Sequence, residues 1–371
     1  MAKIVWFTDY PDGATSGYAT IAKPICNGLI ELGHQVKVVA MSNEGKEHWE
    51  KFSIIPVQHF EEGIAAIHNL NILWKPDIVV CAVDIPVLET LYEKIHKDGI
   101  KFVVLCPMEN GPLMQSWAMG LSQYDKILFI SKLAEDEAHK IGLHNAEHLV
   151  IGIDTDIWSH PTVEERKKAK QTLGFDENEK IVLTVADNHE RKNLWAGMAI
   201  FTKMLREHPE ISAKYVIVTR DKSPFGWRLD ELASSLGIAD KLIIFNRGIP
   251  QSQLRLLYAI SDAFLLPSKA EGLGLPILEA MAVGVPCVAT NTGALTELLA
   301  DDRGYLVPSD YSFIDVWGNS KRDMISVEEG SKKLYIAINS ESNSNVEPYI
   351  SSRTWENTVN QFNSVIEELL K

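Results

Sequence analysis

Arginine is absent from the first 155 residues of this 371-residue chain. That stretch holds 12 lysines and 20 acidic residues, a net charge of −8, while the remainder holds 24 basic and 30 acidic residues, a net charge of −6. Contacts to the phosphates of a polyanion rely on arginine and lysine. The acidic first half is therefore a poor surface for DNA or RNA, and bulk nucleic acid is not an expected partner.

Cysteine and long hydrophobic runs are also scarce. The four cysteines are widely spaced and form no Cys-x-x-Cys pair, which indicates reduced, buried thiols in a cytosolic protein rather than a disulfide or zinc framework. No stretch approaches the roughly 18 uninterrupted apolar residues of a membrane span. The first apolar run is broken by Asp9 and Pro11, too early for a signal peptide. These absences predict a cytoplasmic protein without a membrane span.

Short apolar runs alternate with helical patterns along the whole chain. The run from Ile78 to Cys81 is continuous, as is typical of parallel strands that are covered by helices on both faces. A chain of this length is expected to form two domains, and a polar segment between about residues 152 and 178 separates two series of these units. The expected strands are residues 3–8, 34–41, 76–84, 100–107, 124–131 and one within 147–158, then 180–187, 214–219, 241–246, 263–268, 286–290 and 304–307.

Two amphipathic helices mark the beginning and the end of the chain. The first is predicted from Tyr18 to Leu32, with Ser16 as its N-cap and Pro24 as a cause of bending. Its predicted buried face consists of Tyr18, Ile21, Ala22, Ile25, Leu29 and Leu32. The second lies within residues 353–371.

The segment SKAEGLGLPILEAMAVG, from Ser268 to Gly284, predicts a binding site at the end of a strand. Gly272 and Gly274 allow a ligand to approach the backbone closely. Pro276 favours a helix start, which directs free N–H groups and the positive end of the helix dipole at an anion such as a diphosphate.

Two glutamates flank this turn, and carboxylates beside an anion must bind something else. Glu271 precedes the turn and Glu279 lies about one turn into the helix. Carboxylates accept hydrogen bonds from sugar hydroxyls. If each glutamate binds one sugar, the ligand contains two sugars joined by a diphosphate. Such a ligand is a nucleotide sugar. The alternative is a helix start that is simply rich in acidic residues.

A second candidate site follows the strand at 180–187. Here Arg191 and Lys192 lie at a strand-to-helix turn, from which they could neutralise the same diphosphate. A solvated pair of cations in the first turn of a helix is the alternative.

The sequence PSKAEGLGLPILEAMAVGVPCVATNTGALTELL resembles the donor-binding signature of the family 4 retaining glycosyltransferases (glycosyl transferases group 1), E-G-(F/L)-G-L-P-x-L-E-A-M-A. The resemblance extends through SGYATIAKPICNGLIELGHQVKVV, RKN, LYAISDAFLLPS and SSRTW, so it covers most of the chain. It implies the α/β GT-B fold, in which two Rossmann-like domains with parallel sheets face a cleft. The implied domains are 1–155 for the acceptor, 156–352 for the nucleotide sugar, and a helix at 353–371 that crosses back to the first domain.

The resemblance also implies roles for individual residues. Glu279 would bind the nucleotide ribose and Glu271 the transferred sugar, while Lys192, with Arg191, would neutralise the leaving diphosphate. The backbone around Gly272, Gly274 and Leu275 would hold phosphate. The loop of Thr15, Ser16 and Gly17 would reach the donor, although helix capping explains these residues equally well. On the acceptor side the candidates are Glu109, in CPMENGP, and Asp84, although both could be ordinary surface carboxylates.

One position departs from the family pattern. The family pattern is V-G-R, followed after four residues by Lys. This chain has Val185, Ala186 and Asp187, followed after four residues by Lys192, so an aspartate occupies the position of the arginine. Either Arg191 replaces the missing arginine, or the donor sits differently, or the diphosphate is stabilised less. Asp187 would then be a local organiser of Arg191 or Lys192, or a contact to the donor sugar.

The predicted function is transfer of a sugar, with retention, from a nucleotide-diphosphate sugar to a hydroxyl of a small molecule, glycan or protein. UDP- and GDP-sugars are the expected donors, and no other cofactor is predicted. The only D-x-D, Asp154–Asp156, lies in a stretch that resembles the family's interdomain linker, so no metal is expected. The alternatives are a noncatalytic nucleotide-sugar-binding protein, a hydrolase or epimerase on the same fold, and a transferase that acts on a modified nucleic-acid base.

Overall fold

The computed structural model describes residues 1–11, 16–95, 99–224, 226–316, 319–341 and 343–371. The chain forms two compact units. The N-terminal unit consists of Met1–Gly152 and Arg353–Lys371, and the C-terminal unit consists of Ile153–Ser352. The sequence-based prediction sets these divisions after residues 155 and 352.

An eight-stranded sheet forms the centre of the N-terminal unit, in the order β3-β4-β2-β1-β5-β6-β7-β8. All neighbouring strands run parallel except β3 and β4. The chain leaves β1 for β2 on one side and later returns to β5 on the other, so the strand order reverses beside β1. The strands are β1 Lys3–Asp9, β2 Gln35–Met41, β3 His48–Trp49, β4 Ser53–Pro56, β5 Ile78–Ala82, β6 Lys101–Cys106, β7 Lys126–Phe129 and β8 Ala146–His148.

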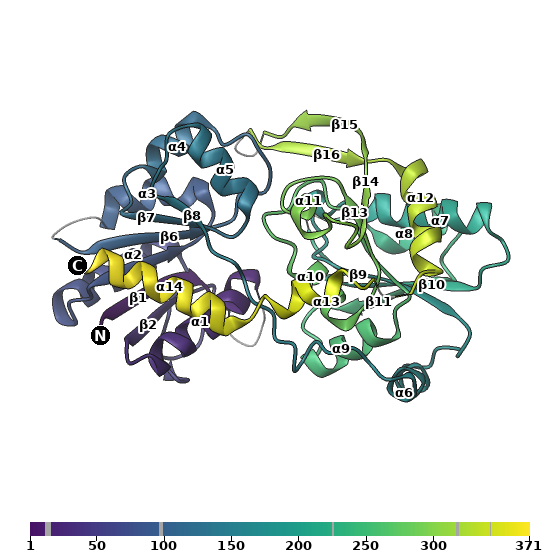
Figure 1. The fold of residues 1–371 in the computed structure, drawn as a ribbon, viewed down its shortest axis with the longest axis horizontal. Helices are drawn as coiled ribbons and strands as arrows, with labels where there is room; N and C mark the ends of the chain where they lie inside the picture. Colours follow the sequence, from purple (N-terminus) through teal and green to yellow (C-terminus); the bar gives the residue numbers. More distant parts are fainter. Residues whose placement is uncertain (12–15, 96–98, 225, 317–318, 342) are drawn as a thin grey trace. The chain divides into compact units, whose positions relative to one another are not determined.

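Helices cover both faces of this sheet (Figure 1), which is why its inner strands β1, β5, β6 and β7 are apolar and almost wholly buried. Successive side chains of β1 point to opposite faces. The ring of Phe7 lies 6.1 Å from that of Phe60 in α2, whereas the ring of Trp6 lies 5.3 Å from that of Phe362 in α14. The helices of this unit are α1 Gly17–Glu31, α2 Phe60–Leu73, α3 Ile85–Ile95, α4 Gln115–Leu121, α5 Lys132–Lys140 and α14 Trp355–Leu369.

The first predicted helix is confirmed as α1. The Ser16 hydroxyl accepts a hydrogen bond from the Ala19 N–H, as an N-cap does. The last helix, α14, packs beside α1 (Figure 1), where a Cβ on Gly28 would lie 2.5 Å from a methyl group of Val359. The prediction that Leu32 is buried is wrong, because this residue caps the helix and is 48% exposed.

A six-stranded parallel sheet forms the centre of the C-terminal unit, in the order β11-β10-β9-β12-β13-β14. Each of the six strands predicted for this half of the chain is present. The strand order reverses between β9 and β12, so ligand binding is expected at the carboxyl ends of these two strands. The strands are β9 Lys180–Val185, β10 Ala213–Thr219, β11 Leu242–Asn246, β12 Ala263–Leu266, β13 Cys287–Thr290 and β14 Tyr305–Val307.

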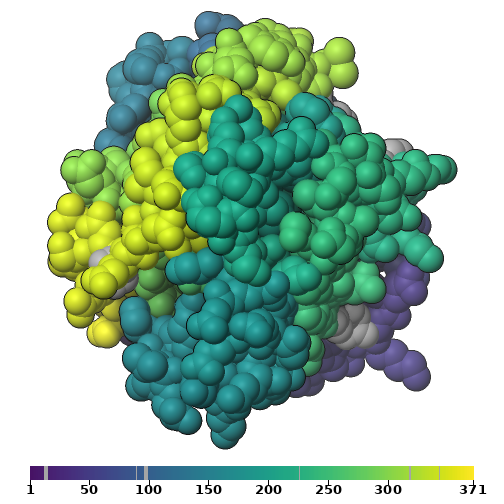
Figure 2. Space-filling view, turned by 90° about the vertical axis from the view of Figure 1, so that its right-hand side faces the viewer, coloured from purple at the N-terminus to yellow at the C-terminus, as the bar shows by residue number. Residues whose placement is uncertain are grey.

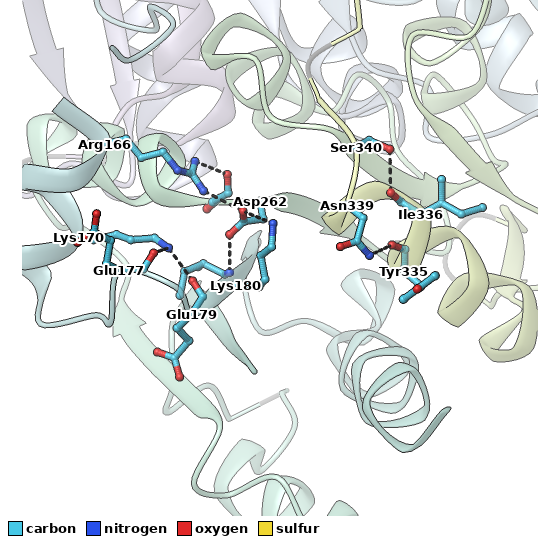
Figure 3. A network of polar contacts seen from close by, with 12 residues as sticks. Arg166, Lys170, Glu177, Glu179, Lys180, Asp262, Tyr335, Ile336, Asn339 and Ser340 are labelled. Atoms are coloured by element: carbon cyan, nitrogen blue, oxygen red, sulfur yellow. Dashed lines mark hydrogen bonds and ion pairs between the residues drawn. The ribbon is translucent and has the colours of Figure 1, made fainter. Parts of the chain in front are cut away.

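Two packing contacts hold helices of this unit to the sheet and to each other. At the amino ends of the strands, Asp262 lies 3.0 Å from Arg166 of α6 and 3.2 Å from Lys180 of β9 (Figure 3). On the outer face, α12 lies against α7 (Figure 2), where the Ser331 hydroxyl donates to Glu207 at 3.1 Å. The helices are α6 Val163–Leu173, the short 3₁₀ helix η1 Glu190–Lys192, α7 Leu194–Glu207, α8 Leu229–Leu236, α9 Gln251–Ile260, α10 Leu275–Val283, α11 Leu295–Leu298, α12 Val327–Ile338 and α13 Val346–Ser351.

An antiparallel hairpin that the sequence pattern did not predict follows β14. It consists of β15 Ser309–Ile314 and β16 Lys321–Ile325. The hairpin is joined to the rest of the unit because the Asp323 N–H donates to the Lys269 carbonyl at 2.8 Å. Among the helices in the described part of the chain, none is long and apolar enough to span a membrane.

Candidate functional site

The two predicted cations lie on a short turn that leaves β9. After β9 ends at Val185, the chain forms η1, which contains Arg191 and Lys192. Asn193 follows with φ of 53°, and its left-handed backbone ends η1 and begins α7. This tight sequence of turns holds both cations at the carboxyl end of the central strand.

Glu271 lies in the loop after the neighbouring strand, β12, and forms ion pairs with both cations. Lys192 Nζ lies 2.5 Å from Oε1 of Glu271, and a terminal nitrogen of Arg191 lies 3.2 Å from Oε2. The Ser268 hydroxyl also donates to Glu271 at 2.6 Å. The structure therefore brings together the three residues predicted for catalysis. In the sequence, Glu271 lies 79 positions after Lys192 and 80 positions after Arg191.

The cluster contains an ionised carboxylate whose charge is stabilised by the two cations. Glu271 is only 5% exposed, and its burial raises the pKa of the carboxyl. Lys192 and Arg191, together with the Ser268 hydrogen bond, outweigh this effect and lower the pKa to about 2, so Glu271 is ionised at neutral pH. The ionised Glu271 carboxylate is thus held between two cations. The alternative in which Arg191 and Lys192 form only a solvated pair is thereby disfavoured.

The helix predicted to point at this cluster is α10. Its N-cap is Gly274, with φ of 93°, a conformation that residues with a Cβ rarely adopt. The helix begins at Leu275, one residue before the predicted start at Pro276. The first N–H groups of a helix have no partner within it and can bind an anion. Gly272, which precedes this cap, is buried.

Glu279 is in a different environment from Glu271. It lies on α10, and the hydroxyl of the buried Tyr258 on α9 donates to its Oε2 at 2.7 Å. Burial raises the pKa of Glu279 to about 7, although the Tyr258 hydrogen bond acts in the opposite direction. The predicted pair of glutamates thus consists of one ionised carboxylate and one that exchanges its proton near neutral pH.

Asp187 forms ion pairs with two arginines, which follow the strands β10 and β11. Its Oδ2 lies 2.6 Å from Arg247, which follows β11, and 3.2 Å from Arg220, which follows β10. Its side chain is 14% exposed. Asp187 therefore gathers two guanidinium groups at the edge of the sheet, and these are not the partners that the sequence suggested, Arg191 and Lys192.

The predicted residues of the N-terminal unit lie at the carboxyl ends of β1, β5 and β6. Ser16 caps α1 and also donates to the Asp9 carbonyl at 3.0 Å, which makes its contribution at least partly structural. Gly17 is the exposed first residue of α1, and Thr15 lies outside the described residues. Asp84 accepts a hydrogen bond from the Tyr18 hydroxyl at 2.5 Å. Glu109 follows β6; the pKa of Tyr18 is raised chiefly by burial and by Asp84, with a smaller effect of Glu109.

The D-x-D segment forms a turn. Oδ1 of Asp154 accepts hydrogen bonds from the N–H groups of Asp156 and Ile157, at 3.1 and 3.2 Å. Within the part of the chain that the structure describes, no group of three or more His, Cys, Asp or Glu side chains is placed to hold a metal ion.

Several site residues were not predicted from the sequence. Tyr258 lies in the quoted LYAISDAFLLPS segment, but a tyrosine on a helix gives no local sign of a carboxylate partner. Arg220 and Arg247 each follow an expected strand, and their position at strand ends was the signal that could have identified them. Lys269 is 4% exposed and pairs with Glu190 beside the cluster.

The chain is similar to known glycosyltransferases in sequence. Residues 165–315 match the family model described as Glycosyl transferases group 1. The N-acetyl-alpha-D-glucosaminyl L-malate synthase of Bacillus anthracis is 29% identical over 190 residues, which cover 50% of this chain and 47% of that protein. The alpha-monoglucosyldiacylglycerol synthase of Streptococcus pneumoniae is 23% identical over 329 residues, which cover 81% of this chain and 73% of that protein. The alignment with the first relative thus spans about half of its length.

The fold of the whole chain is similar to that of solved structures. The structure of HepE from Anabaena, solved in complex with UDP and glucose, matches with a TM-score of 0.71 at 16% identity, over 99% of this chain and 100% of that one. At this level of identity the match concerns the fold. Residues 165–315 are therefore similar to the glycosyl transferases group 1, and the chain has the GT-B fold.

Proposed function

We propose that the chain transfers a sugar, with retention of configuration, from a nucleotide-diphosphate sugar to an acceptor hydroxyl. The observation that carries this proposal is the buried Glu271 held between Lys192 and Arg191. A buried carboxylate with two cations offers acceptors for sugar hydroxyls and positive charge for a diphosphate in one place.

The donor would be held at both of its sugars. Glu271 would accept hydrogen bonds from the transferred sugar, and Glu279 would accept them from the nucleotide ribose. The diphosphate between them would bind Lys192 and the N–H groups at the start of α10. UDP- and GDP-sugars are the donors of this kind that we propose, and the fold similarity to HepE, which was solved with UDP and glucose, supports the first.

In the reaction, the bond between the anomeric carbon and the diphosphate oxygen breaks as the acceptor oxygen bonds to the same carbon. Lys192, Arg191 and the α10 N-terminus would stabilise the negative charge on the departing diphosphate. The acceptor hydroxyl would approach on the side of the leaving group and give its proton to a phosphate oxygen. This step needs no separate base and no metal ion.

The first experiment is a thermal-shift panel of nucleotide-diphosphate sugars on the full chain, followed by turnover of the donors that bind. A ligand at 100 times its Kd should raise the free energy of unfolding by about 2.7 kcal/mol. The proton NMR coupling of the anomeric proton in the product would then report retention or inversion.

Each outcome assigns the chain to a different function. Donor binding without turnover, with any acceptor, would indicate a noncatalytic binding protein. Release of free sugar would indicate a hydrolase, conversion of the donor sugar an epimerase, and an inverted product would contradict the retaining mechanism. Lys192→Ala should lower kcat on the order of 100-fold, because it removes one preorganised charge at the leaving group.

A further inference from the structure

The hairpin β15–β16 buries one carboxylate, that of Asp323. Most of β15 is exposed, whereas Asp323 on β16 is only 3% exposed. Burying a carboxylate costs free energy unless hydrogen bonds compensate for the lost water. Its Oδ1 accepts from the Ser312 hydroxyl and lies 3.0 Å from Lys321 Nζ, and its Oδ2 accepts from the Thr292 hydroxyl at 2.8 Å. The carboxylate therefore joins the hairpin to the loop after β13.

The backbone of Asp323 also holds the loop after β12, in which Glu271 lies. The Asp323 N–H donates to the Lys269 carbonyl at 2.8 Å, and the Thr292 hydroxyl lies 3.2 Å from the same carbonyl. The Lys269 N–H in turn donates to the Arg191 carbonyl at 2.9 Å. Lys269 is thus bonded on one side to the hairpin and on the other to the turn that carries the two proposed cations.

Lys269 is a neighbour in the chain of the residues that fix the Glu271 carboxylate. Ser268 directly precedes it and donates to Glu271 at 2.6 Å. Glu271 follows it by two positions, and the Glu271 carbonyl accepts from the Ala294 N–H at 3.0 Å. A shift of the Lys269 backbone would therefore move both Ser268 and Glu271 relative to the cations.

We propose that Asp323 is a positioning residue, which fixes Glu271 relative to Arg191 through Thr292 and the backbone of Lys269. Its effect on turnover rests on the proposed glycosyl transfer, whereas the positional link rests on the hydrogen bonds alone. In this role Asp323 does not contact the donor. A displacement of about 1 Å at a reacting group can lower a rate by about 100-fold, so a remote residue of this kind has a measurable effect.

The kinetic test compares Asp323→Ala with Asp323→Asn in the full chain. Asp323→Ala removes both acceptors but keeps the backbone N–H, and it should lower kcat by about 10- to 100-fold. Affinity for the nucleoside diphosphate of the active donor should change by less than about twofold, because this ligand lacks the transferred sugar. Asp323→Asn keeps an oxygen for Thr292 and should recover most of the loss, because the link consists of hydrogen bonds.

Hydrogen exchange measures the link without any donor. In Asp323→Ala the amides of Lys269 and Ala294 should exchange at least about tenfold faster than in the unaltered chain. The amide of Leu183, in the buried strand β9, should be accelerated much less. Equal acceleration of all three amides would show only a general loss of stability and would overturn the proposal.

Asp310→Ala, which removes an exposed carboxylate from the same hairpin, is the matched control and should change neither kcat nor exchange. An unaltered kcat in Asp323→Ala, or an Asp323→Asn variant as impaired as Asp323→Ala, would also overturn the proposal. Selective acceleration of the Lys269 and Ala294 amides in a chain that turns over no donor would refute the proposed transfer but leave the positional link standing.

Discussion

Lys192 and Glu271 form an ion pair, with Nζ and Oε1 2.5 Å apart, although the chain carries them on the turn after β9 and the loop after β12. Arg191 binds the other oxygen of the same carboxylate. The cations proposed for the diphosphate are thus held in place before any donor binds. Their positions are preorganised, which is the condition for electrostatic stabilisation of a leaving group.

Replacement of Glu271 by glutamine should separate binding from turnover. The change leaves Lys192 and Arg191 without their shared anion, so the nucleotide diphosphate should bind at least as tightly as before. Turnover should fall on the order of 100-fold, because the cations lose their fixed positions and the sugar loses an acceptor. Calorimetry with UDP and initial rates with the active donor would measure the two effects.

The matched control for this variant is Glu231→Gln. It removes an exposed carboxylate on α8 that pairs with Arg228, the residue before this helix. It should change neither quantity. If Glu271→Gln keeps the kcat of the unaltered chain, the proposed role of Glu271 in transfer is wrong.

Glu279 should make both stability and donor binding depend on pH. Burial raises its pKa to about 7, compared with about 4.3 in an unfolded chain. Between these values the folded chain holds one more proton than the unfolded chain, so the free energy of unfolding should fall as pH rises. The loss should be on the order of 3 kcal/mol and complete slightly above pH 7. Urea unfolding between about pH 5 and pH 8 would measure it.

Donor affinity should change in the opposite direction, because a ribose hydroxyl donates better to an ionised carboxylate. Glu279→Gln should remove both pH dependences, while Glu356→Gln, at an exposed position on α14, should leave them. Unchanged pH profiles in Glu279→Gln would show that another group titrates.

Much of the fold could be predicted because the relevant patterns are local. Continuous apolar runs identify the parallel strands, and the spacing of Glu271 and Glu279 around a Gly-Leu-Gly-Leu-Pro turn identifies a strand-to-helix site. The strands β3 and β4 and the hairpin β15–β16 were missed. In the hairpin, Tyr311 and Ile314 are each 60% exposed, so apolarity there does not report burial.

The partners within the site could not be predicted, because they depend on strand order. Lys192 meets Glu271 because β9 and β12 are neighbours, and Asp187 meets Arg220 and Arg247 because β10 and β11 follow on the other side. Nothing in the local sequence gives this order. Similarly, Tyr258 reaches Glu279 only through the packing of α9 against α10.

Activity should persist in EDTA. Oδ1 of Asp154 accepts hydrogen bonds from the N–H groups of Asp156 and Ile157, so the D-x-D segment forms a turn, and the cations beside Glu271 can stabilise the diphosphate. Initial rates after dialysis against EDTA should equal those with added magnesium or manganese. Complete loss of turnover in EDTA, with recovery on adding either ion, would contradict this prediction.

Asp187 and Arg247 should be energetically coupled. Asp187→Asn should weaken the hold on Arg247 and Arg220 and reduce turnover with every donor alike, if the aspartate acts by positioning these guanidinium groups. In a double-mutant cycle on kcat/KM, Asp187→Asn and Arg247→Met should show a coupling of about 0.5–3 kcal/mol. The same cycle with Arg220→Met should give a smaller value, because Arg220 is more distant, at 3.2 instead of 2.6 Å, and 60% exposed. A change of preferred donor in Asp187→Asn, with no coupling to Arg247, would instead make Asp187 a direct contact to the sugar.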